Sequence, residues 1–287
     1  MPELPEVETI RLGLQKYLVG HKIIDIQIKA SKLFVGSAKQ IIGAKIIGLK
    51  RIGKGLIIEL DNNFVLAVHL KMTGQLVYSD NKTKNLVLSP KVGGATLPSK
   101  YSHIIFALDP SAGSGQAAFL YFNDLRQFGW IKVVKKDEVM QIPFFKEMGP
   151  EPLKDLTLEK LKEIVSKSNL AIKVLLMDQK KIGGIGNIYA NDALFDAKIY
   201  PQRKAKDLKS EEIEKLYEAI LHILQKSLDC GGSSDENFVN ALGQEGNYQK
   251  HALVYGRVGE SCHTCGSKIQ KIQLGGRGTY FCPVCQG

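Results

Sequence analysis

Long apolar runs are missing from this sequence of 287 residues, and none approaches the roughly 18 residues that a membrane-spanning helix needs. The first residues, MPELPEVETI, are rich in Glu and lack the basic and then apolar stretches of a secretory signal. Internal repeats and low-complexity tracts are also absent. Hydrophobic residues make up 44% and charged residues 24% of the chain, a balance that excludes an intrinsically disordered protein. We therefore expect a globular, cytoplasmic protein without a membrane segment.

Cysteine is scarce, and its distribution excludes a disulfide framework. Of five cysteines, four lie in the last 26 residues, as Cys262-x-x-Cys265 and, after sixteen intervening residues, Cys282-x-x-Cys285. Two such pairs at this separation are typical of a zinc site. Four thiolates complete a tetrahedral shell and leave no open position for water, so we predict one structural Zn²⁺ and no catalytic metal. The fifth, Cys230, is interpreted as a plain thiol.

Acidic residues are too few to balance the basic ones. The difference is 39 − 29 = +10, and nine basic residues stand against one Asp between Lys16 and Lys54. This excess favours a polyanionic partner such as nucleic acid. Ribosome-associated proteins and other basic enzymes share it, so charge alone leaves these alternatives open.

The apolar pattern changes its period twice along the chain. Helical spacing over residues 9–19 is followed by short β-rich runs between Ile23 and Val134, and helical spacing returns from Thr157 to about Leu228. The segment FFKEMGPEPL marks the boundary. We predict an α+β fold, with an N-terminal helix and an antiparallel β-sandwich followed by a helical part. The predicted domains are 1–145 for the sandwich, 146–246 for the helical domain and 247–287 for the module with four cysteines.

Two glycine-rich segments could hold anions. Residues 181–187 (KIGGIGN) could present backbone N–H groups at a helix N-terminus, although a helix connector without any ligand has the same composition. GGRGTYFC between the cysteine pairs predicts a tight hairpin with Arg277 at its tip. That Arg could bind phosphate as a fork, or be a solvated surface charge.

The N-terminus offers a nucleophile. Met before a small Pro is normally removed, which would expose the amine of Pro2 beside the carboxyl group of Glu3. An α-amino group has a pKa of about 7.8, against about 10.4 for Lys, so much more of it is neutral at pH 7. Such an amine can attack an aldehyde-like sugar carbon and form a Schiff base. A frayed terminus without function is the alternative.

Several motifs together resemble the formamidopyrimidine-DNA glycosylase family along essentially the whole chain. They are PELPEVET, GKGL around Lys54, HLKMTG around Met72, NDLRQFG around Arg126, IGGIGNIYA around Asn187, VYGR, CHTC and GGRGTYFCPVC. The resemblance implies a β-sandwich domain, a helix-two-turn-helix domain and a zinc finger, with damaged double-stranded DNA in the cleft between the domains. It further implies a monomer that excises oxidised purines and then cleaves the strand, in the cytoplasm of a bacterium.

The same resemblance implies roles for individual residues. Pro2 would attack C1′ of the damaged nucleotide, Glu3 would be the general acid/base, and Lys54 would act at the flanking phosphate. Glu6 would support this cluster, and Arg277 would bind phosphate and take part in the second elimination. His69 and Asn187 would hold the backbone, while Met72, Arg126 and Phe128 would fill the gap left by a flipped base. Further DNA contacts are expected from His103, Lys173 and Tyr255.

A lesion loop would read the flipped base, mostly through backbone groups. Its residues are Ser233, Ser234, Asp235, Glu236, Asn237 and Phe238. The two acids are unexpected beside a polyanion. Lys71 is a second departure, because it stands where a Gly is familiar in the family.

A sister enzyme acting on oxidised pyrimidines is one alternative function. A non-catalytic DNA-binding protein is another, but it would not need Pro2, Glu3 and Lys54 together.

Overall fold

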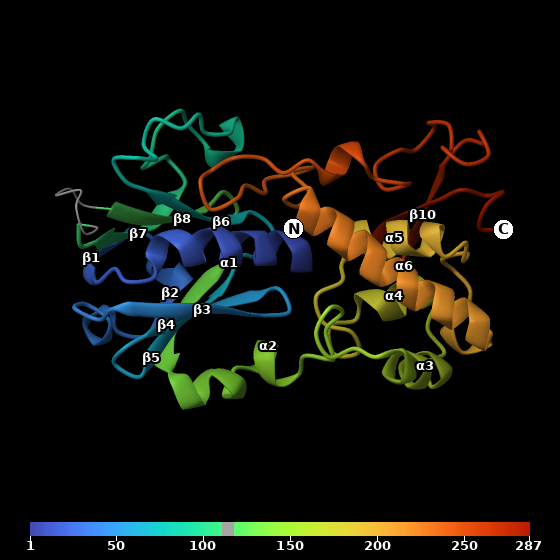
Figure 1. Ribbon diagram of the computed structural model, residues 1–287, viewed down its shortest axis with the longest axis horizontal. Helices are drawn as coiled ribbons and strands as arrows, with labels where there is room; N and C mark the ends of the chain where they lie inside the picture. The colour runs from blue at the N-terminus through green and yellow to red at the C-terminus, as the bar shows by residue number, and fades with distance from the viewer. Residues whose placement is uncertain (111–117) are drawn as a thin grey trace. The chain divides into compact units, whose positions relative to one another are not determined.

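The computed structural model describes residues 1–110 and 118–287, and these divide into two compact units. The first comprises Met1–Lys146 and Cys230–Asn247, and the second Glu147–Asp229 and Tyr248–Gly287. Figure 1 shows both units along the chain. No helix in the described part of the chain is long and apolar enough to span a membrane.

The first unit is built from an N-terminal helix and two sheets. Its helices are α1 (Leu4–Leu18) and α2 (Pro143–Lys146), and its strands are β1 (Ile23–Ile28), β2 (Phe34–Val35), β3 (Ile46–Ile52), β4 (Gly55–Leu60), β5 (Phe64–His69), β6 (Gly74–Ser79), β7 (Ser102–Leu108), β8 (Ala118–Asp124) and β9 (Trp130–Lys135). One sheet has the order β1-β7-β8-β6 and the other β2-β9-β5-β4-β3. All pairings are antiparallel except β2 with β9.

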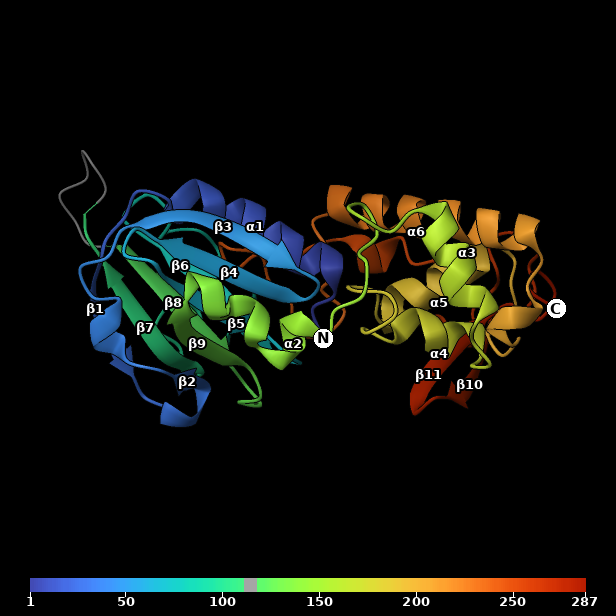
Figure 2. The same cartoon turned by 90° about the horizontal axis from the view of Figure 1, so that it is seen from below.

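The core of this unit lies between the sheets and beneath α1. Residues with helical spacing on α1, such as Leu14 and Leu18, share one apolar cluster with Leu66 of one sheet and Phe106 and Phe122 of the other. Figure 2 shows α1 alongside β3, with which it packs. Burial of this apolar area drives the association of helix and sheets.

Helix α1 starts at the residues that carry the predicted chemistry. Pro5 falls in its first turn, where a missing N–H costs nothing, and Glu3 precedes it in extended conformation. The helix therefore begins at Leu4, before the Thr9 at which the apolar pattern starts. Pro2 and Glu3, which directly precede the helix, are both buried.

The second unit is helical and ends in a hairpin. Its elements are α3 (Leu158–Ser166), α4 (Ile172–Met177), α5 (Asn187–Asp196), α6 (Ser210–Asp229), β10 (Gln270–Leu274) and β11 (Arg277–Phe281). Helix α5 packs against α4, α6 and β11 (Figure 2). Its residues from Ile188 to Phe195 are all buried, which explains why apolar side chains occur on every face of the helix.

The α+β fold with an antiparallel β-sandwich is confirmed. The units differ, however, from the predicted division into three domains. Residues 230–247 belong to the first unit because Phe238 and Ala241 lie in its core. Residues 248–287 belong with the helices because Val254 and Ile269 pack with Phe195 of α5. Composition reveals a loop or a cysteine module but not the core on which it packs.

Candidate active site and nucleic-acid interface

Glu6 ties the start of α1 to the loop predicted to read the base. Its Oε2 accepts the backbone N–H of Glu3 at 2.9 Å, and its Oε1 accepts the N–H of Ser233 at 2.7 Å. Glu3 and Glu6 are only 2% and 1% exposed. Buried charge-assisted bonds of this kind are short and strongly directional. Glu6 therefore fixes Glu3 and the loop in one arrangement.

The lesion loop, residues 233–238, is anchored on both sides of its tip. Ser234 donates its Oγ–H to the carbonyl of Phe238 at 2.8 Å, and the Phe238 ring is buried in the sandwich core. At the tip, Glu236 Oε2 lies 3.0 Å from the N-terminal nitrogen of Met1. The structure thus places an acid of the loop at the chain terminus, beside the predicted nucleophile.

Lys54 lies in the turn between β3 and β4. The strand register pairs Gly55 with His69, so the turn is adjacent to that histidine. A Cβ on Gly55 would lie 2.6 Å from Cε1 of Phe145, so only Gly lets the turn approach this aromatic ring. Lys54 itself is 4% exposed. The GKGL motif therefore holds one lysine in a closely packed turn rather than on a solvated surface.

His69 is an uncharged donor in this site. Burial lowers its pKa to about 3, and the charges of Lys71 and Lys54 add to the effect. Its Nδ1 lies 2.9 Å from the N–H of Lys71 and accepts it, so the proton of the neutral ring resides on Nε2. Contacts with Trp130 and Phe144 fix the ring plane. His69 can donate a hydrogen bond to a phosphate oxygen but does not neutralise it.

The three residues predicted to fill a gap in DNA lie on two loops joined by Asp124. Its Oδ1 accepts from Thr73 Oγ1, and its Oδ2 accepts the N–H of Gly129 at 2.7 Å. Thr73 Oγ1 in turn accepts the N–H of Arg126 at 2.9 Å. This network holds the loop that precedes β6 against the loop that follows β8. Met72 on the first loop is half-buried.

Phe128 projects from the second of these loops. Its side chain is 53% exposed, and the guanidinium of Arg126 lies over its ring at 4.7 Å. An exposed Phe stacked by an Arg is poorly explained by core packing, and it suits insertion between bases. His103 supports the start of the same loop, because its Nε2 lies 2.9 Å from the carbonyl of Asp124.

In the second unit, α5 organises the predicted phosphate contacts. Asn187 is its first residue, where backbone N–H groups and the helix dipole favour an anion. Asn191 accepts the N–H of Tyr280 in β11 at 2.8 Å. Asp192, fully buried, accepts the N–H groups of Val254 and Tyr255 at 3.0 Å each. One helix thereby positions Asn187, Tyr255 and the hairpin.

The hairpin presents Arg277 at its turn. Gly275 and Gly276 both have positive φ, 56° and 73°, as the tightest hairpin turn requires. Leu274 pairs with Arg277, whose side chain is exposed. The predicted hairpin is thus present, with the Arg side chain accessible to a ligand in solvent.

Lys173, a predicted DNA contact, lies inside the second unit rather than on its surface. Lys173 is fully buried, and its Nζ donates to the carbonyl of Gly278 at 2.9 Å and to Thr279 Oγ1 at 2.7 Å. Both bonds tie the ammonium to strand β11 of the hairpin. The AIK segment looks basic in sequence, but its charge stabilises the hairpin that carries Arg277.

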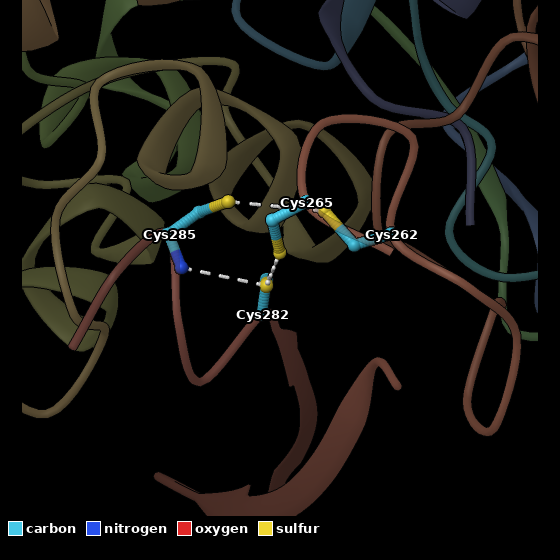
Figure 3. A group of neighbouring side chains, drawn as sticks. All are labelled: Cys262, Cys265, Cys282 and Cys285. Atoms are coloured by element: carbon cyan, nitrogen blue, oxygen red, sulfur yellow. Dashed lines mark hydrogen bonds between the residues drawn. The ribbon is translucent and has the colours of Figure 1, made fainter. Parts of the chain in front are cut away.

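The four cysteines of the tail converge (Figure 3). All four sulfurs lie within 4.8 Å of one another, with 3.4 Å between Cys265 and Cys282 and 3.9 Å between Cys262 and Cys285. Zn–S bonds of about 2.3 Å in a tetrahedron place sulfurs about 3.8 Å apart, so the separations fit one zinc ion. Hydrogen bonds from Ser267 lower the pKa of Cys265 to about 6, whereas burial raises the pKa of Cys282 and of Cys285.

Cys265→Ser is expected to release the zinc and to abolish DNA binding, because structural zinc contributes roughly 10 kcal/mol or more to the folding of small cysteine modules. Metal analysis, thermal unfolding and a duplex-binding assay measure this. Cys230→Ser is the matched control, since Cys230 lies outside the cluster. A zinc-free Cys265→Ser protein that binds DNA normally would contradict the structural role.

Comparison with known proteins agrees with this arrangement. Three family models match the chain: "Formamidopyrimidine-DNA glycosylase N-terminal domain" over residues 1–131, "Formamidopyrimidine-DNA glycosylase H2TH domain" over 148–238 and "Zinc finger found in FPG and IleRS" over 259–287. The formamidopyrimidine-DNA glycosylase of Pelotomaculum thermopropionicum is 41% identical over 100% of this chain and 99% of its own length. The chain belongs to the formamidopyrimidine-DNA glycosylase family.

Solved structures agree with this membership of the formamidopyrimidine-DNA glycosylases. Lactococcus lactis Fpg in complex with DNA containing an abasic site is 36% identical, with a TM-score of 0.86 and 99% of each chain covered. MutM in complex with DNA containing carbocyclic 8-oxo-G is also 36% identical, with a TM-score of 0.85 and the same coverage. The predicted helix-two-turn-helix domain, zinc finger and structural zinc are confirmed.

Sequence reasoning missed several residues whose side chains hold the predicted site residues in place. Thr73 and Asp124 join the two loops that are predicted to fill a gap in DNA. Asn191 and Asp192 join α5 to the tail. The sequence does indicate a special role for Asn191 and Asp192, because these adjacent polar residues interrupt the otherwise apolar helix NIYANDALFD. Thr73 and Asp124 carry no such signal, since their bond crosses 51 residues.

Proposed function

We propose that this protein is a DNA glycosylase that removes oxidised purines from duplex DNA and then cleaves the strand at the resulting abasic site. Membership of the family over the full chain supports the reaction class. The single structural observation that best supports this function is a pair of hydrogen bonds made by Glu6. They join Glu3 to Ser233 of the lesion loop. A base reader is thereby fixed to the segment that carries the nucleophile.

In the proposed reaction, the amine of Pro2 acts once Met1 has been removed. Its lone pair attacks C1′, the glycosidic bond breaks, and the base leaves with the bonding electrons and a proton. Glu3 exchanges the protons required for departure of the base and opening of the sugar. The secondary amine forms an iminium at C1′, which makes the C2′ proton acidic. Loss of that proton expels the 3′ phosphate, and a second elimination expels the 5′ phosphate.

Phosphate contacts then position the DNA. Lys54 and Arg277 would stabilise the phosphates that depart, while Asn187 and the neutral His69 would donate hydrogen bonds. The zinc, when bound, holds the cysteine module and supplies no chemistry to the reaction. We propose that the protein acts as a monomer, as the family resemblance implies. It would act on chromosomal DNA in the cytoplasm of a bacterium.

Access to C1′ requires that the damaged nucleotide leave the stack. Flipping costs a few kcal/mol, less for a damaged base, and leaves a gap in the duplex. We propose that Phe128 inserts between bases, Met72 fills the void and Arg126 bonds the unpaired base on the opposite strand. The exposure of Phe128 favours this assignment, as does the support that Thr73 and Asp124 give to both loops.

An incision assay tests the function directly. Purified protein is expected to cut duplexes containing 8-oxoguanine or a formamidopyrimidine, leaving phosphates on both sides of the gap, and to leave undamaged duplex intact. Each good discriminating contact is worth about tenfold to hundredfold in rate, so we expect oxidised pyrimidines to be cut at least about tenfold more slowly. Preferred cleavage of oxidised pyrimidines would support the sister function, and binding without cleavage would support a non-catalytic protein.

A further inference from the structure

The lesion loop is held by a lysine outside it. Lys91 lies in the short helix η3 (Pro90–Val92), and its Nζ donates to the carbonyl of Ser234. The same ammonium pairs with Glu245 Oε2 at 2.9 Å. Ser89 donates to the other carboxylate oxygen of Glu245 at 2.6 Å, so the acid that orients Lys91 is itself fixed.

A buried glutamine holds the other end of the loop. Gln75 of β6 is 3% exposed, and its Nε2 donates to the carbonyls of Asn237 at 2.7 Å and Lys91 at 2.9 Å. Its Oε1 accepts from Asn123 at 3.3 Å. Both N–H groups and the oxygen of the amide are therefore engaged, which fixes its orientation. Gln75 links the loop to η3 through a single amide group.

These two contacts determine where loop N–H groups point. A peptide bond is planar and trans, so a carbonyl and the N–H that follows it point in opposite directions. Fixing the Ser234 carbonyl orients the N–H of Asp235, and fixing the Asn237 carbonyl orients the N–H of Phe238. A backbone N–H can recognise an acceptor oxygen on a base. Two such donors are thus aimed by side chains outside the loop.

The loop needs this support because the glycines before it allow many backbone conformations. Gly231 and Gly232 precede it with φ of 71° and 84°, and fixing one residue's backbone costs roughly 1–2 kcal/mol. Contacts made before the base arrives remove part of that cost from binding. Asp235 and Glu236 at the tip are not themselves suited to hold DNA, since both carry negative charge.

We propose that Lys91 and Gln75 are positioning residues that hold the lesion loop in its base-reading conformation before an oxidised purine enters. This inference rests on the proposed function of the loop. It assigns discrimination of the base to a clamp, formed by Lys91 and Gln75, that contacts the loop through the carbonyls of Ser234 and Asn237. The carbonyl oxygens of an oxidised purine are acceptors that such oriented N–H donors would bond.

Lys91→Met tests the clamp because it keeps the length of the side chain and removes the ammonium. We expect kcat/KM for excision of 8-oxoguanine to fall roughly tenfold to hundredfold, as for loss of a charge-assisted hydrogen bond. Cleavage of a duplex with a preformed abasic site should change less than about twofold, because no base is read. Lys91→Arg should recover much of the loss, since it keeps a charged donor.

A matched control separates positioning from general attraction to DNA. Lys84 is an exposed lysine of the same segment, and Lys84→Met removes the same charge without touching the loop. Gln75→Leu is an independent variant, because it removes the hydrogen bond to the Asn237 carbonyl at the other end of the lesion loop. In both clamp variants, amide hydrogen exchange of residues 234–238 in the DNA-free protein should become faster, and in Lys84→Met it should not.

Equal losses on the base-containing and abasic substrates, or unchanged loop exchange in Lys91→Met and Gln75→Leu, would overturn the clamp. A merely structural role would lower activity on both substrates alike. Failure of the proposed function is a different result, because the wild-type protein would then fail to cut the 8-oxoguanine duplex. A wild type that cuts both, with variants that behave like wild type, rejects the clamp alone.

Discussion

Glu3→Gln is expected to lower base excision by about 10²–10⁴-fold, the usual worth of a general acid/base. The amide has nearly the same shape as the carboxylate and leaves the backbone N–H of Glu3 bonded to Glu6 at 2.9 Å, so the fold should persist. Cleavage of a preformed abasic site should fall less, because the base has already left. Single-turnover rates on the two duplexes measure the difference.

Asp25→Asn provides the control for loss of one carboxylate, since Asp25 lies exposed on β1. It should retain wild-type rates on both duplexes. An equal fall on both substrates in Glu3→Gln would show that Glu3 serves the elimination steps or the fold. A fall confined to abasic DNA would assign the proton transfer for base departure to another group.

Protein that retains Met1 is expected to lose both excision and strand cleavage by on the order of 10³-fold or more, the scale seen when a covalent nucleophile is lost. With Met1 present, the nitrogen of Pro2 is part of a peptide bond and has no lone pair available to attack C1′. Inhibition of the methionine aminopeptidase during expression supplies this form, and mass spectrometry measures the trimmed fraction. Incision rates are then plotted against that fraction.

Later treatment with the aminopeptidase provides the control, because it should restore activity to protein that is otherwise unchanged. Duplex binding should survive retention of Met1, since Asn187 and Arg277 lie in the second unit. Wild-type rates in fully untrimmed protein would remove Pro2 from the mechanism. Loss of binding together with catalysis would point to an effect on the loop, where Glu236 contacts Met1.

Local patterns in the sequence predicted what depends on spacing. Cys262 and Cys265, followed after sixteen intervening residues by Cys282 and Cys285, specify a zinc site because two cysteines separated by two residues can share a metal. Gly275 and Gly276 likewise specify a hairpin turn, and both adopt the positive φ that it needs. The strands of the sandwich follow from short β-rich runs, and the structure confirms them.

Contacts between residues far apart in the sequence could not be predicted from local patterns. Lys173 was a candidate DNA contact by motif position alone, whereas its Nζ donates to Thr279 Oγ1, 106 residues along the chain. Gln75 and Asn237 are 162 residues apart, so no pattern could pair them. Residues 230–247 join the sandwich because Phe238 fills its core, a fact of packing rather than composition.

The chemistry at the N-terminus is the central claim, and reductive trapping tests it most directly. An iminium between Pro2 and C1′ is reducible, so borohydride added during turnover on 8-oxoguanine duplex should yield a stable protein–DNA adduct. Peptide mapping by mass spectrometry should place the DNA on the N-terminal proline, with Met1 absent. Attachment at Lys54, or no adduct while the strand is being cut, would contradict the account.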